Sequence, residues 1–336
     1  MELIKSIKKN TIFLLLITIV ILFFILKDDF NNITTTLSRM DYKFIIIAII
    51  FWLLSIILKG YINYKTVNNK KQISLKEAIK HNVITQFFNG ITPFSSGGQP
   101  MEIYMLTEHS ISGAKATTIT IQNFIFYQVA LVLYGLLAVT YNAIFHIFPK
   151  VPLLGKLTLI GFLINTLVAI ALFVITFSPK FTKKVTNIII KLLVKLKIIK
   201  DEKKTAEKWN LKLEEFHSSA KVLRKRKLLF IEGVIINLIS LTCLYIVPLF
   251  IVYSLHNYTS LNIADTLTSS AYVLIIGAFV PIPGASGGIE YGFLKFFGNF
   301  ITGTNLSAIL IIWRFITYYL GLIIGALAFS LEKKGD

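Results

Sequence analysis

Six long apolar runs limit what this chain can fold into. A helix that crosses the hydrocarbon core of a bilayer needs about 20 mostly apolar residues, and fewer where flanking Lys or Tyr side chains reach the interface. Hydrophobic residues make up 55% of the 336 positions, which is more than a soluble core of ordinary proportions can bury. The sequence therefore predicts an all-α integral membrane protein with six full spans: Thr11–Leu26, Phe44–Leu58, Ile119–Phe148, Leu157–Phe177, Leu228–Leu255 and Leu306–Leu331.

The first run has one property of a secretory signal, because several lysines precede it. It ends at Lys27-Asp28-Asp29 without a small-residue cleavage site, so we interpret it as a retained span. The single cysteine, Cys243, lies in another apolar run and excludes an intramolecular disulfide. We expect Cys243 to serve packing rather than chemistry.

The net charge of +18 is concentrated in three places: the N-terminus, the Lys59–Lys80 segment and the Lys180–Lys227 segment. The last of these holds 16 basic and 5 acidic residues, too many to span, and its intermittent apolar residues predict one or two amphipathic helices on the membrane surface. By the positive-inside rule all three places are cytoplasmic, as are both termini. Nucleic-acid binding is the competing explanation of the charge, but no aromatic-rich soluble domain accompanies it.

A short Pro/Gly motif occurs once in each half of the chain. Residues 92–102 read Thr-Pro-Phe-Ser-Ser-Gly-Gly-Gln-Pro-Met-Glu, and residues 281–290 read Pro-Ile-Pro-Gly-Ala-Ser-Gly-Gly-Ile-Glu. Both contain Pro-x-x-Ser-Gly-Gly, and clusters of Pro and Gly break helices. Irregular backbone at membrane depth is tolerated only where protein or a water-filled cavity satisfies it, and matching interruptions in two halves indicate a transport site. The simpler alternative is two loop turns with a chance similarity.

Counting spans from the basic segments predicts how each motif enters the membrane. Segment 81–106, with a second helix opening at Pro100, enters and leaves on the cytoplasmic side, and segment 263–300 does so from outside. The two motifs would meet near the midplane as an inverted repeat of broken helices. The predicted organisation is a single transmembrane domain with three parts: a first half 1–178, a basic segment 179–227 and a second half 228–336.

Three ionisable residues at predicted membrane depth are candidates for function: Glu102, Glu290 and Arg314. Arg314 needs an acidic partner, and we expect at least one of the two glutamates to supply it. The resulting contact could be a structural ion pair that only locks the fold, or a switchable gate or clamp for a zwitterionic headgroup. Lys295 is a weaker candidate, because it lies close enough to an interface to snorkel.

The glycines of both motifs are expected to leave backbone amides free at a helix start, which is an anion site. The nearby glutamates would repel a simple anion, so an ammonium group, a proton or a headgroup with both charges suits the site better. No catalytic residue, metal ligand or cofactor is predicted. The residues predicted to line the substrate path are Thr92, Pro93, Ser96, Gly97, Gly98, Glu102, Pro283, Ser286, Gly287, Gly288, Glu290 and Arg314.

At these residues the chain resembles the flippase-like membrane domain of the lysylphosphatidylglycerol synthase (MprF) family. Members carry Thr-Pro-x-x-Ser-Gly-Gly-x-Pro in the first half, matched by Thr92 to Pro100, and a Pro-x-Pro-Gly stretch before Glu in the second, matched by Pro281 to Glu290. An Arg in the last span, here Arg314, also fits. Two-part members continue into an aminoacyltransferase domain, whereas this chain stops at Asp336, so the resemblance is to a free-standing form.

The resemblance implies a lipid translocator of the bacterial cytoplasmic membrane, acting on aminoacylated phosphatidylglycerol or another charged lipid. The alternative is a phosphatidylglycerol lysyltransferase, alone or as the membrane half of a split synthase, linked to resistance against cationic antimicrobial peptides. A membrane scaffold or receptor is a third class. Expected partners are an anionic or aminoacylated phospholipid, the membrane and a separate aminoacyltransferase, with no nucleic acid bound directly.

Overall fold

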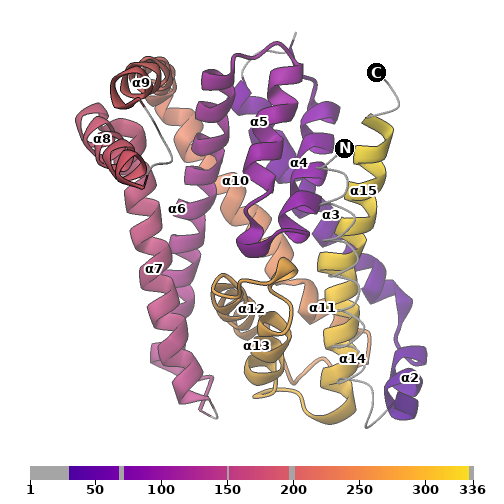
Figure 1. The fold of residues 1–336 in the computed structure, drawn as a ribbon. Coiled ribbons are helices and arrows are strands. Elements are labelled where there is room, and N and C mark those ends of the chain that lie inside the picture. The colour runs from indigo at the N-terminus through magenta and orange to yellow at the C-terminus, as the bar shows by residue number, and fades with distance from the viewer. Residues whose placement is uncertain (1–29, 68–71, 150, 197–200, 333–336) are drawn as a thin grey trace.

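The computed structural model describes residues 30–67, 72–149, 151–196 and 201–332, and every regular element in these ranges is a helix (Figure 1). Five helical stretches in these ranges are long and apolar enough to cross a membrane, as predicted for an all-α membrane protein. The predicted first span, Thr11–Leu26, lies outside the described residues. The long helices are α3 (Tyr42–Val67), α6 (Gly113–Phe145), α7 (Pro152–Phe177), α10 with α11 (Lys227–Tyr245, Val247–Tyr253), and α14, η3 and α15 (Gly303–Arg314, Phe315–Tyr319, Leu320–Glu332).

Shorter helices lie between the long ones and at the ends of the bundle. Two pairs are broken by a 3₁₀ turn that contains one of the Pro/Gly motifs. The shorter elements are α2 (Phe30–Ser38), α4 (Leu75–Gly90), η1 (Pro93–Ser95), α5 (Gly98–Glu108), α8 (Pro179–Lys195), α9 (Glu202–Arg224), α12 (Ile263–Gly277), η2 (Pro283–Ala285) and α13 (Gly288–Phe297).

Two predicted boundaries were wrong. The helix α3 does not end at Leu58 but continues to Val67, because no proline interrupts it and its one glycine, Gly60, is needed for packing. A Cβ on Gly60 would lie 2.7 Å from Cα of Ile79, so α3 and α4 approach more closely than any larger residue allows. The helix after the first motif begins at Gly98 rather than at Pro100, which falls in its first turn.

The core of the bundle contains stacked aromatic rings, and polar contacts join its helices. Phe293 stacks on Trp313 with ring centroids 4.6 Å apart, which joins α13 to α14. The Ser240 hydroxyl of α10 donates to the carbonyl of Ser55 in α3 at 2.9 Å. Since lipid is as apolar as the helix surfaces, close packing and such hydrogen bonds stabilise the bundle in place of a hydrophobic driving force.

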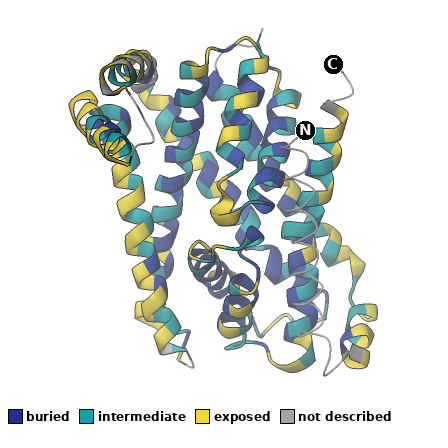
Figure 2. Ribbon diagram, in the orientation of Figure 1, coloured by how far each residue is buried: buried dark blue, intermediate teal, exposed yellow. Residues whose placement is uncertain are grey.

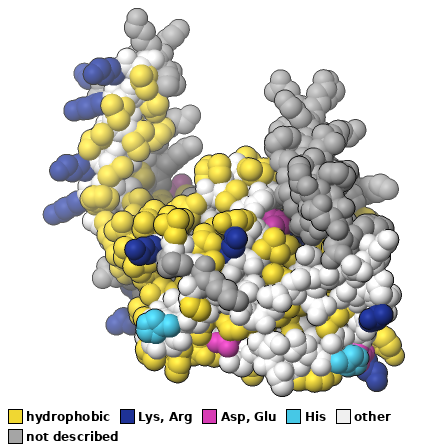
Figure 3. Space-filling view, turned by 90° about the horizontal axis from the view of Figure 1, so that it is seen from below, with side chains coloured by type: hydrophobic (Ala, Val, Ile, Leu, Met, Phe, Trp, Pro, Cys, Tyr) yellow, Lys and Arg dark blue, Asp and Glu magenta, His cyan; other side chains and the backbone are white. Residues whose placement is uncertain are grey.

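The outer surface of the bundle is apolar, as a lipid-facing surface must be. Figure 2 shows α7 at one edge with exposed residues along its outer side, and its exposed side chains include Leu157, Leu163 and Leu167. The basic segment forms two helices, α8 and α9, that contact each other at one end of the bundle. In Figure 3, seen from the opposite end, this pair projects sideways with lysines along its outer edge and apolar side chains toward the viewer. The segment therefore forms two helices, as predicted, and their position on a membrane surface stays a prediction.

Candidate functional site at the crossing of two broken helices

The two Pro/Gly motifs meet near the middle of the molecule. In Figure 1 the α4–α5 hairpin descends from the end that carries α8 and α9, and the α12–α13 hairpin rises from the opposite end. The turns η1 and η2 contact each other, and α4 also contacts η2. This arrangement agrees with the predicted pair of broken helices that approach from opposite faces.

The first turn holds its glycine amides with its own side chains. Gly97 N–H donates to the Thr92 hydroxyl at 2.9 Å, and Gly98 N–H donates to Asn89 Oδ1 at 2.9 Å. Phe94 and Ser95 have φ near +53°, a left-handed conformation that costs non-glycine residues about 1–2 kcal/mol each. The expectation that Gly97 and Gly98 leave their amides free was wrong, because Thr92 and Asn89 occupy the positions of an incoming anion.

The second turn is closed in a similar way by an acid. Gly287 N–H donates to Glu290 Oε2 at 2.6 Å, a short charge-assisted hydrogen bond. Ser286 is buried, with its hydroxyl 3.1 Å from the Pro283 carbonyl. The expectation of a free amide at Gly287 was therefore wrong as well, and neither turn offers a ready anion site of backbone amides.

Glu290 and Arg314 form a buried ion pair, which confirms that one glutamate pairs with Arg314. Arg314 Nε lies 2.7 Å from Glu290 Oε1, and both side chains are 6% exposed. The Nε–H bond does not point at that oxygen, so this contact is an ion pair rather than a hydrogen bond. Arg314 Nη2 donates to the Gly284 carbonyl at 3.1 Å and lies 3.5 Å from the Ser286 hydroxyl. The guanidinium thus holds the whole second turn.

Tyr318 connects this ion pair to the first hairpin. The Arg314 guanidinium lies 4.4 Å from the Tyr318 ring centroid, and the Tyr318 hydroxyl donates to the carbonyl of Gly90 at 2.9 Å. Gly284, at φ +64°, presses its backbone against the same ring, since a Cβ there would lie 2.2 Å from it. The stretch η3 that carries Tyr318 is a π-helical segment, a feature that recurs at functional sites.

Glu102 has no such partner. Its side chain is buried, and its polar contact is with Asn123 Nδ2 of α6 at 3.4 Å. Asn123 Oδ1 accepts in turn from the Thr66 hydroxyl of α3 at 2.7 Å. Among the described residues no Lys, Arg or His lies within ion-pair distance of Glu102. A buried carboxyl group is thus left with an amide as its neighbour.

A lysine contacts α6 at the turn that follows Asn123. Lys59 Nζ is 5.0 Å from the ring centroid of Tyr127, and Tyr127 follows Asn123 by one turn of α6, a rise of about 6 Å. Lys59 lies within α3 rather than after its end. The four helices α3, α4, α5 and α6 contact one another in a ring around this part of the molecule.

The two turns also differ in exposure. Residues Pro93 to Ser96 are exposed, with Phe94 at 63%, whereas Pro283 and Ser286 are buried. The structure therefore brings Pro283, Ser286, Glu290 and Arg314 into one cluster and places Glu102 in another. The tip of the first turn belongs to neither cluster and is exposed. In the described part of the chain, no cluster of three or more His, Cys, Asp or Glu side chains forms that could hold a metal ion.

A comparison with known protein families gives a match over most of the chain. One family, described as the lysylphosphatidylglycerol synthase TM region, matches residues 11–325. The chain belongs to this family. The match covers both broken hairpins and the final span with Arg314, so the site lies inside the region that defines the lysylphosphatidylglycerol synthase TM family. A comparison with curated proteins finds no match.

Sequence reasoning missed three side chains of this site: Tyr318, Lys59 and Asn89. Tyr318 stands four residues after Arg314, so the helical period places both on one face, and that signal was available. Asn89 stands in the last turn of α4, where its side-chain oxygen accepts from the Gly98 amide at the start of the following helix. Lys59 was taken as the end of a short span because it follows an apolar run.

Proposed function

We propose that this protein moves a charged phospholipid between the leaflets of a bacterial cytoplasmic membrane, with the headgroup passing between the two broken hairpins. The observation that carries the proposal is the meeting of two helix breaks from opposite ends, beside a buried carboxyl group without a cation. A translocator needs a polar route through the midplane, and helix breaks at corresponding places in two halves are the usual means of building one.

The charges of Glu102 and Lys59 suit a headgroup that carries both an ammonium group and a phosphate. Glu102 would attract the ammonium group, because burial makes an uncompensated carboxylate costly and a cation relieves that cost. Lys59, which contacts Tyr127 one turn of α6 after Asn123, would attract the phosphate. An aminoacylated phosphatidylglycerol carries these groups, and the family match favours a lipid of that kind.

In this mechanism the Glu290–Arg314 pair acts as a gate. Arg314 holds the second turn closed, and Tyr318 extends that hold to the carbonyl at the end of α4. A phosphate that competes for Arg314 would weaken both contacts together and allow the turns to separate. The charge of α8 and α9 favours a cytoplasmic position for them, with the C-terminal end of α15 on the same side.

The direct test is headgroup movement in proteoliposomes. We expect purified protein to move fluorescent aminoacylated phosphatidylglycerol between leaflets faster than protein-free vesicles do, and Glu102→Gln to abolish the increase. Transport at the wild-type rate by Glu102→Gln, Glu290→Gln and Arg314→Ala alike would remove this site from consideration.

The family name supports a second candidate, a phosphatidylglycerol lysyltransferase or the membrane half of a split synthase. A transferase needs an acid or base beside the acceptor in a pocket that admits lysyl-tRNA. We expect no lysyl-phosphatidylglycerol from lysyl-tRNA and phosphatidylglycerol with this chain alone. Robust synthesis in that assay would favour the enzyme over the translocator.

A further inference from the structure

A pocket of about 420 Å³ lies between α8 and α9, away from the hairpin site. It adjoins the end of α7, because His217 Nδ1 of α9 lies 3.2 Å from the carbonyl of Thr176 in the last turn of that helix. Exposed apolar side chains of α8, such as Ile188 and Leu192, mark a face that would rest on lipid. With that face on lipid, the pocket would lie at the level of the headgroups.

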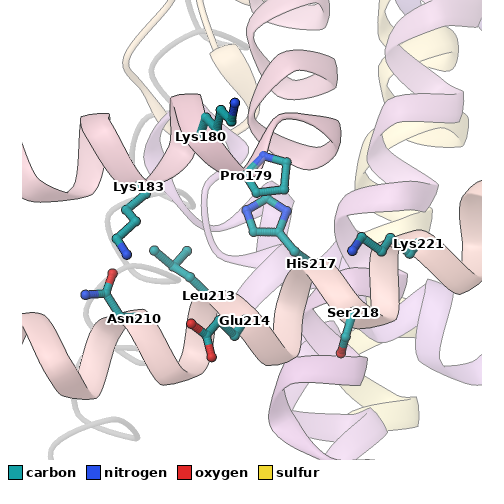
Figure 4. Close-up of a pocket in the computed structure, with 9 residues that line it drawn as sticks. All are labelled: Pro179, Lys180, Lys183, Asn210, Leu213, Glu214, His217, Ser218 and Lys221. Atoms are coloured by element: carbon teal, nitrogen blue, oxygen red, sulfur yellow. The ribbon is translucent and has the colours of Figure 1, made fainter.

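Basic and polar side chains line the pocket together with apolar surface, and Figure 4 shows how the side chains lie. Lys183 of α8 and Lys221 of α9 extend into the gap between the helices, whereas Lys180 points away from it. Among the described residues, none of these lysines forms an ion pair with Glu214, the one acid in the lining. The remaining lining residues are Pro179, Asn210, Leu213, His217 and Ser218.

His217 supplies a buried acceptor without a donor. A carbonyl can only accept, so the contact with Thr176 puts the proton on Nδ1 and leaves Nε2 with its lone pair. Nε2 is buried and has no hydrogen-bond partner among the described residues. Burial lowers the pKa of His217, the hydrogen bond to the Thr176 carbonyl opposes this shift, and the nearby charge of Lys221 adds to the lowering. A ligand hydroxyl would satisfy this nitrogen.

We propose that the α8–α9 pocket binds the phosphodiester headgroup of an anionic lipid that carries a free hydroxyl. Lys183 and Lys221 neutralise the phosphate, and the hydroxyl donates to His217 Nε2. The shared chemistry of lipid and free phosphate is the anion, and the position beside the lipid-facing side of α8 favours the lipid. The site is separate from the headgroup path between the hairpins, and binding here holds the helix pair on the membrane surface.

The test is native mass spectrometry of the full chain in detergent with three probes: phosphatidylglycerol, phosphatidylmethanol and inorganic phosphate. Phosphatidylmethanol has the same diester charge but no free hydroxyl. We expect Lys183→Gln with Lys221→Gln to lose one bound phosphatidylglycerol, with affinity at that site reduced about tenfold, since each lysine contributes a charge-assisted contact. The matched control, Lys184→Gln with Lys191→Gln, removes the same charge from α8 outside the pocket and should keep affinity within about twofold.

His217→Ala should abolish the preference for phosphatidylglycerol over phosphatidylmethanol. Both lipids should still bind through their phosphate groups. Equal losses in the pocket and control variants, or equal affinity of the wild-type chain for both lipids, would overturn the proposal. Inorganic phosphate that displaces the lipid at equal concentration would instead identify a site for free phosphate. The Lys183→Gln, Lys221→Gln variant should still move lipid in proteoliposomes, which separates this site from the proposed function.

Discussion

The two broken hairpins share a motif but differ in how their acids are treated. Glu290 lies against Arg314 and caps Gly287, so its charge is compensated, and Pro283 and Ser286 of the second turn are buried. Glu102 lies against an amide of α6, and the tip of its turn is exposed. The difference comes from the neighbouring long helix, which supplies an arginine in one half and an asparagine in the other.

This contrast indicates that Glu290 stabilises the structure, whereas Glu102 is available to bind a substrate. A carboxylate that already has a cation gains little from a passing ammonium group, whereas one without a cation gains much. The second hairpin is therefore suited to stabilise the structure, and the first is suited to bind a cationic group of the substrate. Changes that remove charge should accordingly damage folding at the second hairpin and transport at the first.

Arg314→Ala should have the largest effect on stability. It leaves Glu290 buried without a cation and releases the second turn, which we expect to cost about 3–5 kcal/mol. Thermal unfolding in detergent, read beside the amount of protein in membranes, measures this loss. The double change Arg314→Leu with Glu290→Leu removes both charges and should recover much of the stability. A single variant that folds normally but does not transport would show that the pair acts only as a gate.

Gly284→Ala should come next, at about 2–3 kcal/mol. The new Cβ meets the Tyr318 ring, and the left-handed φ of +64° adds about 1–2 kcal/mol of strain. Gly303→Ala is the matched control, because Gly303 has the same φ with open space around it and therefore reports the strain alone. If both substitutions lower the unfolding temperature equally, the contact between the second turn and Tyr318 contributes nothing.

The fold was largely predictable because membrane helices leave strong signals. Apolar runs of span length marked the five long helical stretches, and the Pro/Gly clusters marked both breaks within a few residues. The pattern of residues 180–227 correctly indicated two helices outside the long apolar stretches. The wrong end of α3 arose because a lysine after an apolar run is typical of a span end, and nothing local shows that Lys59 faces a tyrosine of another helix.

The buried charges of the site were predictable, but their pairing and several neighbouring side chains were not. Sequence position gave Glu102, Glu290 and Arg314 as buried charges, but which glutamate meets Arg314 depends on how α13 packs against α14. The amides of Gly97 and Gly98 were misjudged for the same reason, since Thr92 and Asn89 reach them only through the exact path of the turn. Contacts between side chains and backbone across a turn leave no periodic signal.

Glu102→Gln should sharpen the comparison by affecting transport without affecting folding. Glutamine keeps the shape and the contact with Asn123 but cannot balance a cation, so we expect at least a tenfold loss of transport, about 1.4 kcal/mol. Thermal stability should change by less than about 1 kcal/mol, because no buried cation is left behind. Glu108→Gln is the control, since Glu108 is exposed on the same helix. A large loss of stability without loss of transport would assign Glu102 to the fold.

Tyr318→Phe should have the smallest effect and addresses the connection between the two halves. It removes the hydrogen bond to the Gly90 carbonyl but keeps the ring beneath Arg314, so we expect a loss of about 1 kcal/mol in unfolding free energy. Tyr318→Leu removes the ring contact as well and should cost about 1 kcal/mol more. If the hydroxyl couples the Glu290–Arg314 pair to the first hairpin, Tyr318→Phe should raise the rate of lipid movement, because the turns then separate more easily. An unchanged rate with the expected loss of stability would show that the hydrogen bond only holds the helices together, and that the two halves open independently.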